Sequence, residues 1–188
     1  MRSKKSLCIS LFLCILIACL AVLSVFQIIR VNTRFPQTSI ISTKLGEYLE
    51  FDNLNLKATS YEKIPYKSIS NNNELKSLVN QIDDGEVNLI KTSIMIENNT
   101  NDTIEFPLYD VILQSNSWAN AINLDTFKYF NNNSSLLIKI MPSESIELIL
   151  PYLIHQIQFS NEDWRGVQKR NFQLVFSLYP QKKLIELN

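Results

Sequence analysis

The stretch from Leu7 to Ile29, LCISLFLCILIACLAVLSVFQII, constrains this chain more than any other part of it. None of its residues is charged. As a helix that rises about 1.5 Å per residue it would be roughly 34 Å long, enough to cross a hydrocarbon layer of about 30 Å. We therefore expect a membrane-directed segment followed by one domain.

One interpretation keeps this segment at the membrane, and another removes it. As an uncleaved anchor it would leave the basic residues Arg2, Lys4 and Lys5 on the cytoplasmic side, where positive charge is retained. As a cleaved signal peptide it would exceed the usual apolar core of about 7–15 residues. It also shows no clear A-x-A-like cleavage site before Arg30. The anchor is favoured.

A third interpretation is a lipoprotein signal. Leu16-Ile17-Ala18-Cys19 resembles a bacterial lipobox, in which the cysteine is acylated and becomes the new N-terminus. Residues 20–29 stay apolar, however, whereas a lipobox cysteine usually leads into a polar linker. Lipidation at Cys19 therefore remains the alternative to the anchor.

The rest of the chain is expected to form one domain outside the cell. All three cysteines, Cys8, Cys14 and Cys19, lie in the apolar stretch, so the domain has no disulfide and must be stabilised by its core. This favours a bacterial surface protein. The expected organisation is a cytoplasmic basic N-terminus (1–6), a transmembrane anchor or uncleaved signal (7–29), a linker (30–45) and an extracellular domain (46–188).

The charge balance argues against two kinds of contact, with nucleic acid and with lipid through a polybasic face. The net charge of the whole chain is zero. Beyond Arg30, 14 Lys and Arg residues stand against 18 Asp and Glu residues, so the exposed part is acidic. Nucleic acid needs a basic footprint, and a polybasic lipid-binding face needs a positive patch. We therefore expect neither of these.

The remaining sequence is typical of short β-strands. Residues 87–98 predict the clearest strand, with Ile90, Ile94 and Ile96 on one face. Further strands are expected within 46–60, 103–115, 136–140, 145–150 and 172–178, one short helix over 74–82, and loops over 61–73 and 161–169. A change of phase near Asp52-Asn53 indicates a bulge or a bend. About seven or eight strands without βα alternation predict an all-β sandwich.

Three short motifs carry a family resemblance. They are Gly46-Glu47 with the strand that follows, residues 90–100 ending in Asn98-Asn99-Thr100, and the turn Ile140-Met141-Pro142-Ser143-Glu144-Ser145. Together they resemble the telokin-like, immunoglobulin-type extracellular domains of membrane-anchored Gram-positive surface proteins. Ser143 stands where that family usually has glycine. The resemblance implies an immunoglobulin-like fold and a surface location, and it brings no catalytic residues.

Aromatic residues are the candidates for a recognition surface. Trp118, Trp164 and Tyr152 are the candidate partner-binding residues, because aromatic side chains supply much of the energy in protein and sugar contacts. The competing structural interpretation is that the same side chains close the ends of the sandwich.

Few residues suggest chemistry. His155 is the only histidine, so a histidine-based metal site or triad is not expected, and the three glycines supply no phosphate-binding loop. The acidic pairs Asp83-Asp84 and Glu162-Asp163 are better explained as turn and helix-terminal residues than as catalytic or calcium ligands. We expect no enzyme activity and no cofactor.

The predicted function is therefore contact with a protein partner at the cell envelope by a non-catalytic, single-pass membrane protein. The alternative is a lipoprotein, lipidated at Cys19, that binds a small ligand such as a sugar or a peptide.

Overall fold

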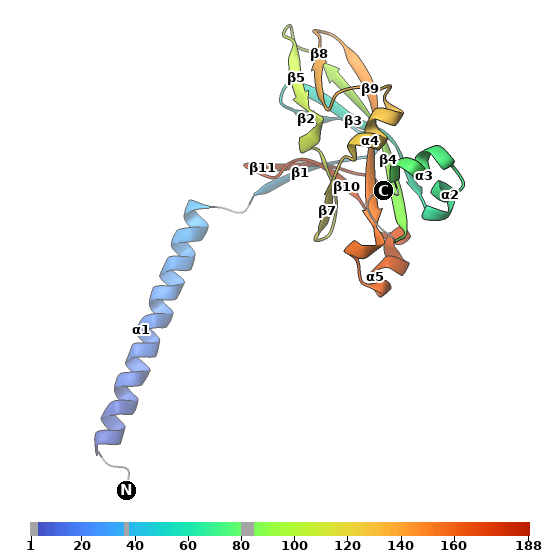
Figure 1. Ribbon diagram of the computed structural model, residues 1–188. Coiled ribbons are helices and arrows are strands. Elements are labelled where there is room, and N and C mark those ends of the chain that lie inside the picture. The colour runs from blue at the N-terminus through green and yellow to red at the C-terminus, as the bar shows by residue number, and fades with distance from the viewer. Residues whose placement is uncertain (1–3, 36–37, 80–84) are drawn as a thin grey trace. The chain divides into compact units, whose positions relative to one another are not determined.

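The computed structural model of the protein describes residues 4–35, 38–79 and 85–188, in two compact units, Met1–Thr38 and Ser39–Asn188 (Figure 1). The first unit contains one helix, α1 (Lys4–Arg34), of 31 residues. From Phe12 to Arg34 its side chains are exposed, and this part is long and apolar enough to cross a membrane. An exposed apolar helix at this position indicates a membrane anchor or a signal sequence.

The second unit is a β-sandwich, which confirms the predicted architecture. One sheet has five strands, in the order β1 (Ser39–Lys44), β11 (Gln181–Glu186), β10 (Gln173–Ser177), β6 (Ile112–Ser115) and β7 (Trp118–Ala121). The other has four, in the order β2 (Leu49–Phe51), β3 (Leu54–Ile64), β4 (Val87–Asn98) and β9 (Ser145–His155). A two-stranded ribbon pairs β5 (Ile104–Pro107) with β8 (Leu137–Ile140).

The main core lies between the facing sides of the two sheets. The alternation predicted for 87–98 is confirmed, since Ile90, Ile94 and Ile96 on β4 are all buried. They pack in one cluster with residues of the five-stranded sheet, among them Leu113 and Leu174. Burial of apolar area on this scale is the main stabilising term in a domain without disulfides.

Short helices surround the sheets, where the sequence predicted only one. They are α2 (Tyr66–Ser70), α3 (Asn73–Val79), α4 (Leu124–Phe130) and α5 (Asn161–Gly166), with single 3-10 turns over Leu108–Asp110, Gln156–Gln158 and Val167–Lys169. The helix expected over 74–82 is confirmed as far as Val79, and residues 80–82 lie outside the described ranges. Ile69, Leu75 and Val79 form a second core with Leu89 and Leu153 of β4 and β9.

Several expected boundaries were wrong. Residues 30–34 belong to α1 and residues 39–44 form β1, so the linker expected over 30–45 is much shorter. The loops expected over 61–73 and 161–169 contain helices α2 and α5. Residues 39–44 are ordered by contacts with distant residues, because β1 pairs in parallel with β11, the last strand of the chain.

The phase change near Asp52-Asn53 is a hairpin turn and not a bulge within one strand. Asp52 and Asn53 have φ angles of 46° and 64°, and they join β2 to β3. Two successive residues with positive φ are typical of the two-residue turns whose twist matches paired strands. The bulge itself lies further along β3, between Ala58 and Ser60.

The outer edge of β9 is closed by three asparagines. Asn131 donates from Nδ2 to the Ile149 carbonyl and accepts from the Ile149 N–H, each at 2.8 Å. The backbone N–H of Asn123 donates to the Pro151 carbonyl, and Asn120 Nδ2 donates to the Leu153 carbonyl. The nitrogen of Pro151, which carries no hydrogen, therefore faces this outer edge and not β4. No hydrogen bond between β4 and β9 is lost, so β9 can continue through the proline.

Asn98, at the end of β4, joins the two turns on which the family resemblance rests. Its buried side chain donates to the carbonyls of Asp102 (2.7 Å) and Ile140 (3.0 Å) and accepts from Thr100. Its backbone N–H donates to the Glu144 carbonyl, and its carbonyl accepts from the Ser143 N–H. One residue thus connects both turns and the end of β8.

Replacing Asn98 should be severely destabilising. In Asn98→Ala, two carbonyls and two donor groups of Thr100 each lose a hydrogen bond, so we expect the free energy of unfolding to fall by about 3 kcal/mol. Urea unfolding of residues 39–188 measures it. Asn99, the next residue, is exposed and supplies the control. Asn99→Ala should change the free energy of unfolding by less than about 0.5 kcal/mol.

Replacing Ser143 with glycine should stabilise the domain. Ser143 has a φ of 60° in the turn that the Glu144 N–H closes on the Met141 carbonyl at 3.1 Å. Left-handed backbone costs a residue with a Cβ about 1–2 kcal/mol, so Ser143→Gly should raise the free energy of unfolding by about 1 kcal/mol. Ser145 lies in extended β9. Ser145→Gly should instead lower the free energy of unfolding by about 0.5–1 kcal/mol. A change of the same sign in both variants would contradict this explanation.

Candidate functional site

Two of the predicted recognition aromatics, Trp118 and Trp164, belong to one aromatic cluster, in which Trp118 is half-buried. Trp118 on β7 lies 5.7 Å from Phe159 and 6.1 Å from Phe172 between ring centroids, and Phe159 lies 6.0 Å from Trp164. The Trp118–Phe159 and Phe159–Trp164 pairs are tilted and the Trp118–Phe172 pair is edge-to-face, and an edge-to-face pair adds stability beyond the area that it buries. The Trp118 indole N–H donates to Gln158 Oε1 at 3.2 Å.

Trp164 and Tyr152 lie in the core, which corrects the expectation that they face a partner. Trp164 is 9% exposed, and its indole N–H donates to Glu86 Oε2 at 3.0 Å. Tyr152 points from β9 into the sandwich, is fully buried, and donates to the Val111 carbonyl at 3.3 Å. Both side chains make their hydrogen bond inside the protein. Their replacement would therefore change the stability of the domain and would not test binding of a partner.

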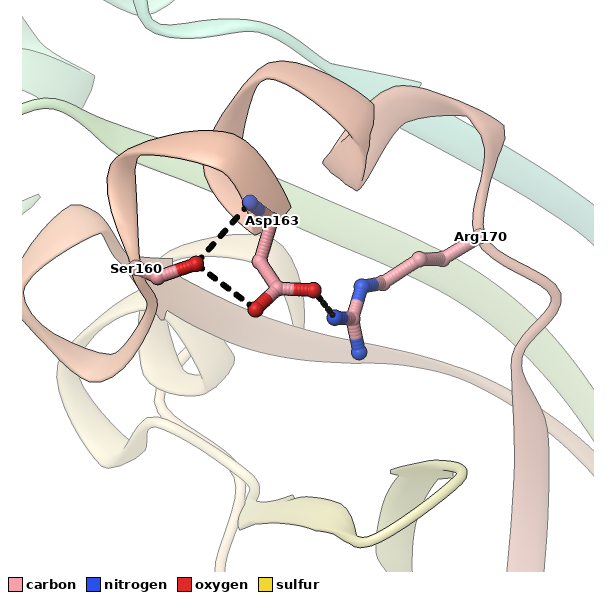
Figure 2. Close-up of polar contacts among 3 residues, drawn as sticks. All are labelled: Ser160, Asp163 and Arg170. Carbon is pink, nitrogen blue, oxygen red and sulfur yellow. Dashed lines mark hydrogen bonds and ion pairs between the residues drawn. The ribbon is translucent and has the colours of Figure 1, made fainter.

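The acidic pair Glu162-Asp163 lies in the first turn of helix α5, where the sequence predicts a loop with turn or helix-terminal residues. Figure 2 shows the contacts: the Asp163 N–H donates to Ser160 Oγ at 3.1 Å, and Ser160 Oγ donates to Asp163 Oδ2 at 2.8 Å. Arg170 donates from Nη2 to Asp163 Oδ1 at 2.9 Å, and its guanidinium lies 4.9 Å from the Phe159 ring centre. An acidic residue near a helix N-terminus is favourable, so the group is structural. The pair Asp83-Asp84 lies outside the described residues.

Lys63 holds the segment that follows α5. Its Nζ donates to the carbonyls of Gln168 (2.9 Å) and Arg170 (2.7 Å), which end the short turn after α5. Burial lowers the pKa of the Lys63 ammonium by desolvation. His155, the only histidine, lies at the end of β9, paired with Val87 of β4. In the described ranges, no three His, Cys, Asp or Glu side chains are grouped so that they could hold a metal ion.

The best candidate site is a polar groove on the outer face of the five-stranded sheet. Its volume is about 410 Å³. We call it the amide groove, because amide side chains predominate among the residues that line it: Gln114, Ser115, Asn116, Asn171, Phe172, Gln173, Lys182, Glu186 and Asn188.

Three adjacent strands organise the amide groove. Gln114 on β6 accepts at Oε1 from Gln173 Nε2 of β10 (3.1 Å) and from Lys182 Nζ of β11 (2.7 Å). Since β10 lies between β6 and β11, the Lys182 side chain crosses it, and its alkyl stem can cover apolar surface. The groove therefore presents amides beside one ammonium and the Glu186 carboxylate, which suits a polar ligand or a polar protein surface.

Sequence reasoning missed this site. Gln114 and Gln173 are 59 positions apart, and neither lies in a motif. The signal available was a polar residue at an outward position of each strand, but pairing of β6 with β10 is visible only in the fold.

The comparisons with known proteins place the chain in a family. Residues 47–183 match the model of a domain of unknown function, DUF5028. The chain belongs to this DUF5028 family. No curated protein matches its sequence.

Several solved structures resemble the chain at low identity. The yjhA protein from Bacillus subtilis is 12% identical, with 77% of this chain and 98% of that chain covered and a TM-score of 0.48. An uncharacterised β-sandwich protein from Clostridium difficile is 11% identical (81% and 97% covered, TM-score 0.43), and a conserved hypothetical protein from Bacillus anthracis is 13% identical (74% and 93%, TM-score 0.46). The protein from Clostridium difficile is itself described as a β-sandwich, the architecture of the second unit of this chain.

Because Tyr152 is buried, the free energy of unfolding should fall as the pH rises above about 10. Burial raises the pKa of the folded-state phenol well above its ordinary value. The unfolded chain ionises near pH 10, and a raised folded-state pKa means that stability is present below pH 10 and is lost above it. Tyr152→Phe cannot ionise, so between pH 8 and pH 11 it should lose about 1.4 kcal/mol less than the wild type. Urea unfolding at both pH values measures this, and an equal effect of the exposed Tyr109→Phe would contradict burial as the cause.

Proposed function

We propose that this DUF5028 protein is a non-catalytic, single-pass membrane protein that binds a protein partner at the cell envelope through its amide groove. The N-terminus would be cytoplasmic and the β-sandwich extracellular. The observation that carries the proposal is the groove itself, an open polar site on the outer sheet face of a domain whose chain begins with an apolar helix of membrane length.

The chemistry of the groove favours contact over reaction. Its hydrogen-bonding groups are mainly amides, which orient a partner without changing protonation near neutral pH. Lys182 and Glu186 add one charge of each sign, and such pairs govern the specificity and rate of association more than its strength. Protein interfaces are commonly polar at their rim and hydrated, so an open groove of this kind is a reasonable docking site.

The kinship with telokin-like, immunoglobulin-type domains is part of the proposal. It is supported by Asn98, because the two motif turns that are distant in sequence meet at this residue through its side chain and backbone. A groove built on three strands is held more precisely than a site on loops, which suits a binding surface on such a sandwich.

The second candidate is a lipoprotein, lipidated at Cys19, that binds a small polar ligand such as a sugar or a peptide in the same groove. The groove volume of about 410 Å³ favours this candidate. It falls within the range of several hundred cubic ångströms that is common for small-molecule sites. The intact mass of the membrane-extracted protein separates the two candidates. A mass that includes residues 1–18 excludes lipidation at Cys19.

Photo-crosslinking in intact cells tests the protein partner. A benzophenone amino acid at Asn116, an exposed residue of the groove, should capture a defined envelope protein in the tagged full-length chain. Glu186→Lys in the same chain should lower that yield about tenfold, the effect of losing about 1.4 kcal/mol of binding energy. The yield is measured by purification through a C-terminal tag and mass spectrometry.

Two controls separate the groove from the rest of the surface. The same crosslinker at exposed Asn99, on a turn of the other sheet, should not capture that protein, and Glu50→Lys on β2 should leave the yield unchanged. Equal capture from Asn116 and Asn99 would move the contact away from the groove. If neither position captures a protein, the partner proposal fails and ligand screening on residues 39–188 follows.

A further inference from the structure

The turn between β10 and β11 exposes apolar side chains that no other described part of the domain covers. Leu178 is 59% exposed and Tyr179 68%, and Ile40 at the start of β1 is 64% exposed. We call residues 177–181 together with Ser39 and Ile40 the hairpin tip. Exposed leucine, isoleucine and tyrosine side chains gathered at one place often mark an interaction surface.

The strand register places the hairpin tip where the chain enters the domain. β1 and β11 run in parallel, side by side in Figure 1, with Ser39 opposite Gln181 and Ile40 opposite Lys182. Arg34 ends α1, and only five peptide steps separate it from Ser39. A chain of that length reaches at most about 18 Å. If α1 spans a membrane, the hairpin tip cannot move far from the lipid headgroups.

The charges around the hairpin tip differ from those of the whole domain. Residues 30–43 and 175–185 contain Arg30, Arg34, Lys182 and Lys183 and no acidic residue. From outside these two segments, β2 brings one acidic residue, Glu50, beside Lys183, because the Glu50 carbonyl accepts from Lys183 Nζ at 2.9 Å. The total charge of the exposed part predicts repulsion from anionic lipids. The four basic side chains of these two segments lower that repulsion locally.

We infer that the hairpin tip rests in the headgroup region of the bilayer that holds α1, with Tyr179 and Leu178 as the inserted side chains. Tyrosine suits this position, because its ring enters the apolar boundary while its hydroxyl remains hydrated. The contact would hold the domain at the membrane surface by its β1–β11 end. It rests on the proposed membrane anchoring and adds a second, non-covalent attachment to it.

Depth-dependent fluorescence quenching tests this contact. The full-length Tyr179→Trp variant is reconstituted into vesicles of phosphatidylcholine and phosphatidylglycerol, with and without doxyl-labelled lipid near the headgroup. Relative to the wild type, which carries the Trp118 and Trp164 background, the added indole should emit at shorter wavelength and lose intensity with the labelled lipid. Interfacial side chains lie about 5–10 Å into the headgroup boundary, within reach of that label.

Ile157→Trp is the matched control. Ile157 is 73% exposed and lies two residues before Phe159. Phe159 belongs to the aromatic cluster that contains Phe172, just before the start of β10. The hairpin tip lies at the opposite end of β10. Its added indole should show no quenching beyond the wild type. Quenching of Tyr179→Trp no greater than that of Ile157→Trp would overturn the inference.

Flotation of the same vesicles in alkaline carbonate separates this inference from the anchoring on which it rests. Protein that floats with the vesicles while Tyr179→Trp shows no quenching refutes the hairpin contact alone. Protein that is released refutes the anchoring and the contact together. Quenching that persists in vesicles of phosphatidylcholine alone would still support insertion of the hairpin tip and would show that anionic lipid is not required.

Discussion

The structure depends most on the hydrogen bonds of Asn98. This residue ends the central strand β4, and its amide satisfies the carbonyls of Asp102 and Ile140 while its backbone binds the turn before β9. A buried amide with all of these partners costs little, but any loss of a partner would leave a polar group unsatisfied in the core. Asn98 therefore fixes the turns that precede β5 and β9, and with them the positions at which these two strands begin.

The same chemistry protects the edge of the four-stranded sheet. Asn131, Asn123 and Asn120 bind alternate residues of β9, and the proline at position 151 has no N–H to offer there. An edge closed in this way cannot pair with another strand. Helices α2 and α3 pack on the far side of β4 and β9. The five-stranded sheet is thus left to carry both surfaces proposed for contact, the amide groove on its face and the hairpin tip at its β1–β11 end.

Local patterns predicted the strands well and the site poorly. The alternation of residues 87–98 is a local property, and β4 has those bounds. Short helices such as α5 escaped prediction, because they are too short for a periodic pattern and depend on caps such as Ser160. Trp164 and Tyr152 misled for a related reason: an aromatic side chain is equally suited to a core and to an interface, and its sequence neighbours do not distinguish the two.

The sequence by itself determined the apolar helix of membrane length, the β-rich domain after it and the absence of disulfides in that domain, because length, charge and alternation are properties of neighbouring residues. The positive φ at Ser143 became visible only in the structure, because serine rarely adopts this backbone conformation. Only the tertiary structure decided that β1 pairs with β11, that Gln114, Gln173 and Lys182 meet on one face, and that Leu178 and Tyr179 lie beside the entry of the chain. These are contacts between residues distant in sequence, and their pairing depends on which strands are adjacent, which no local pattern encodes.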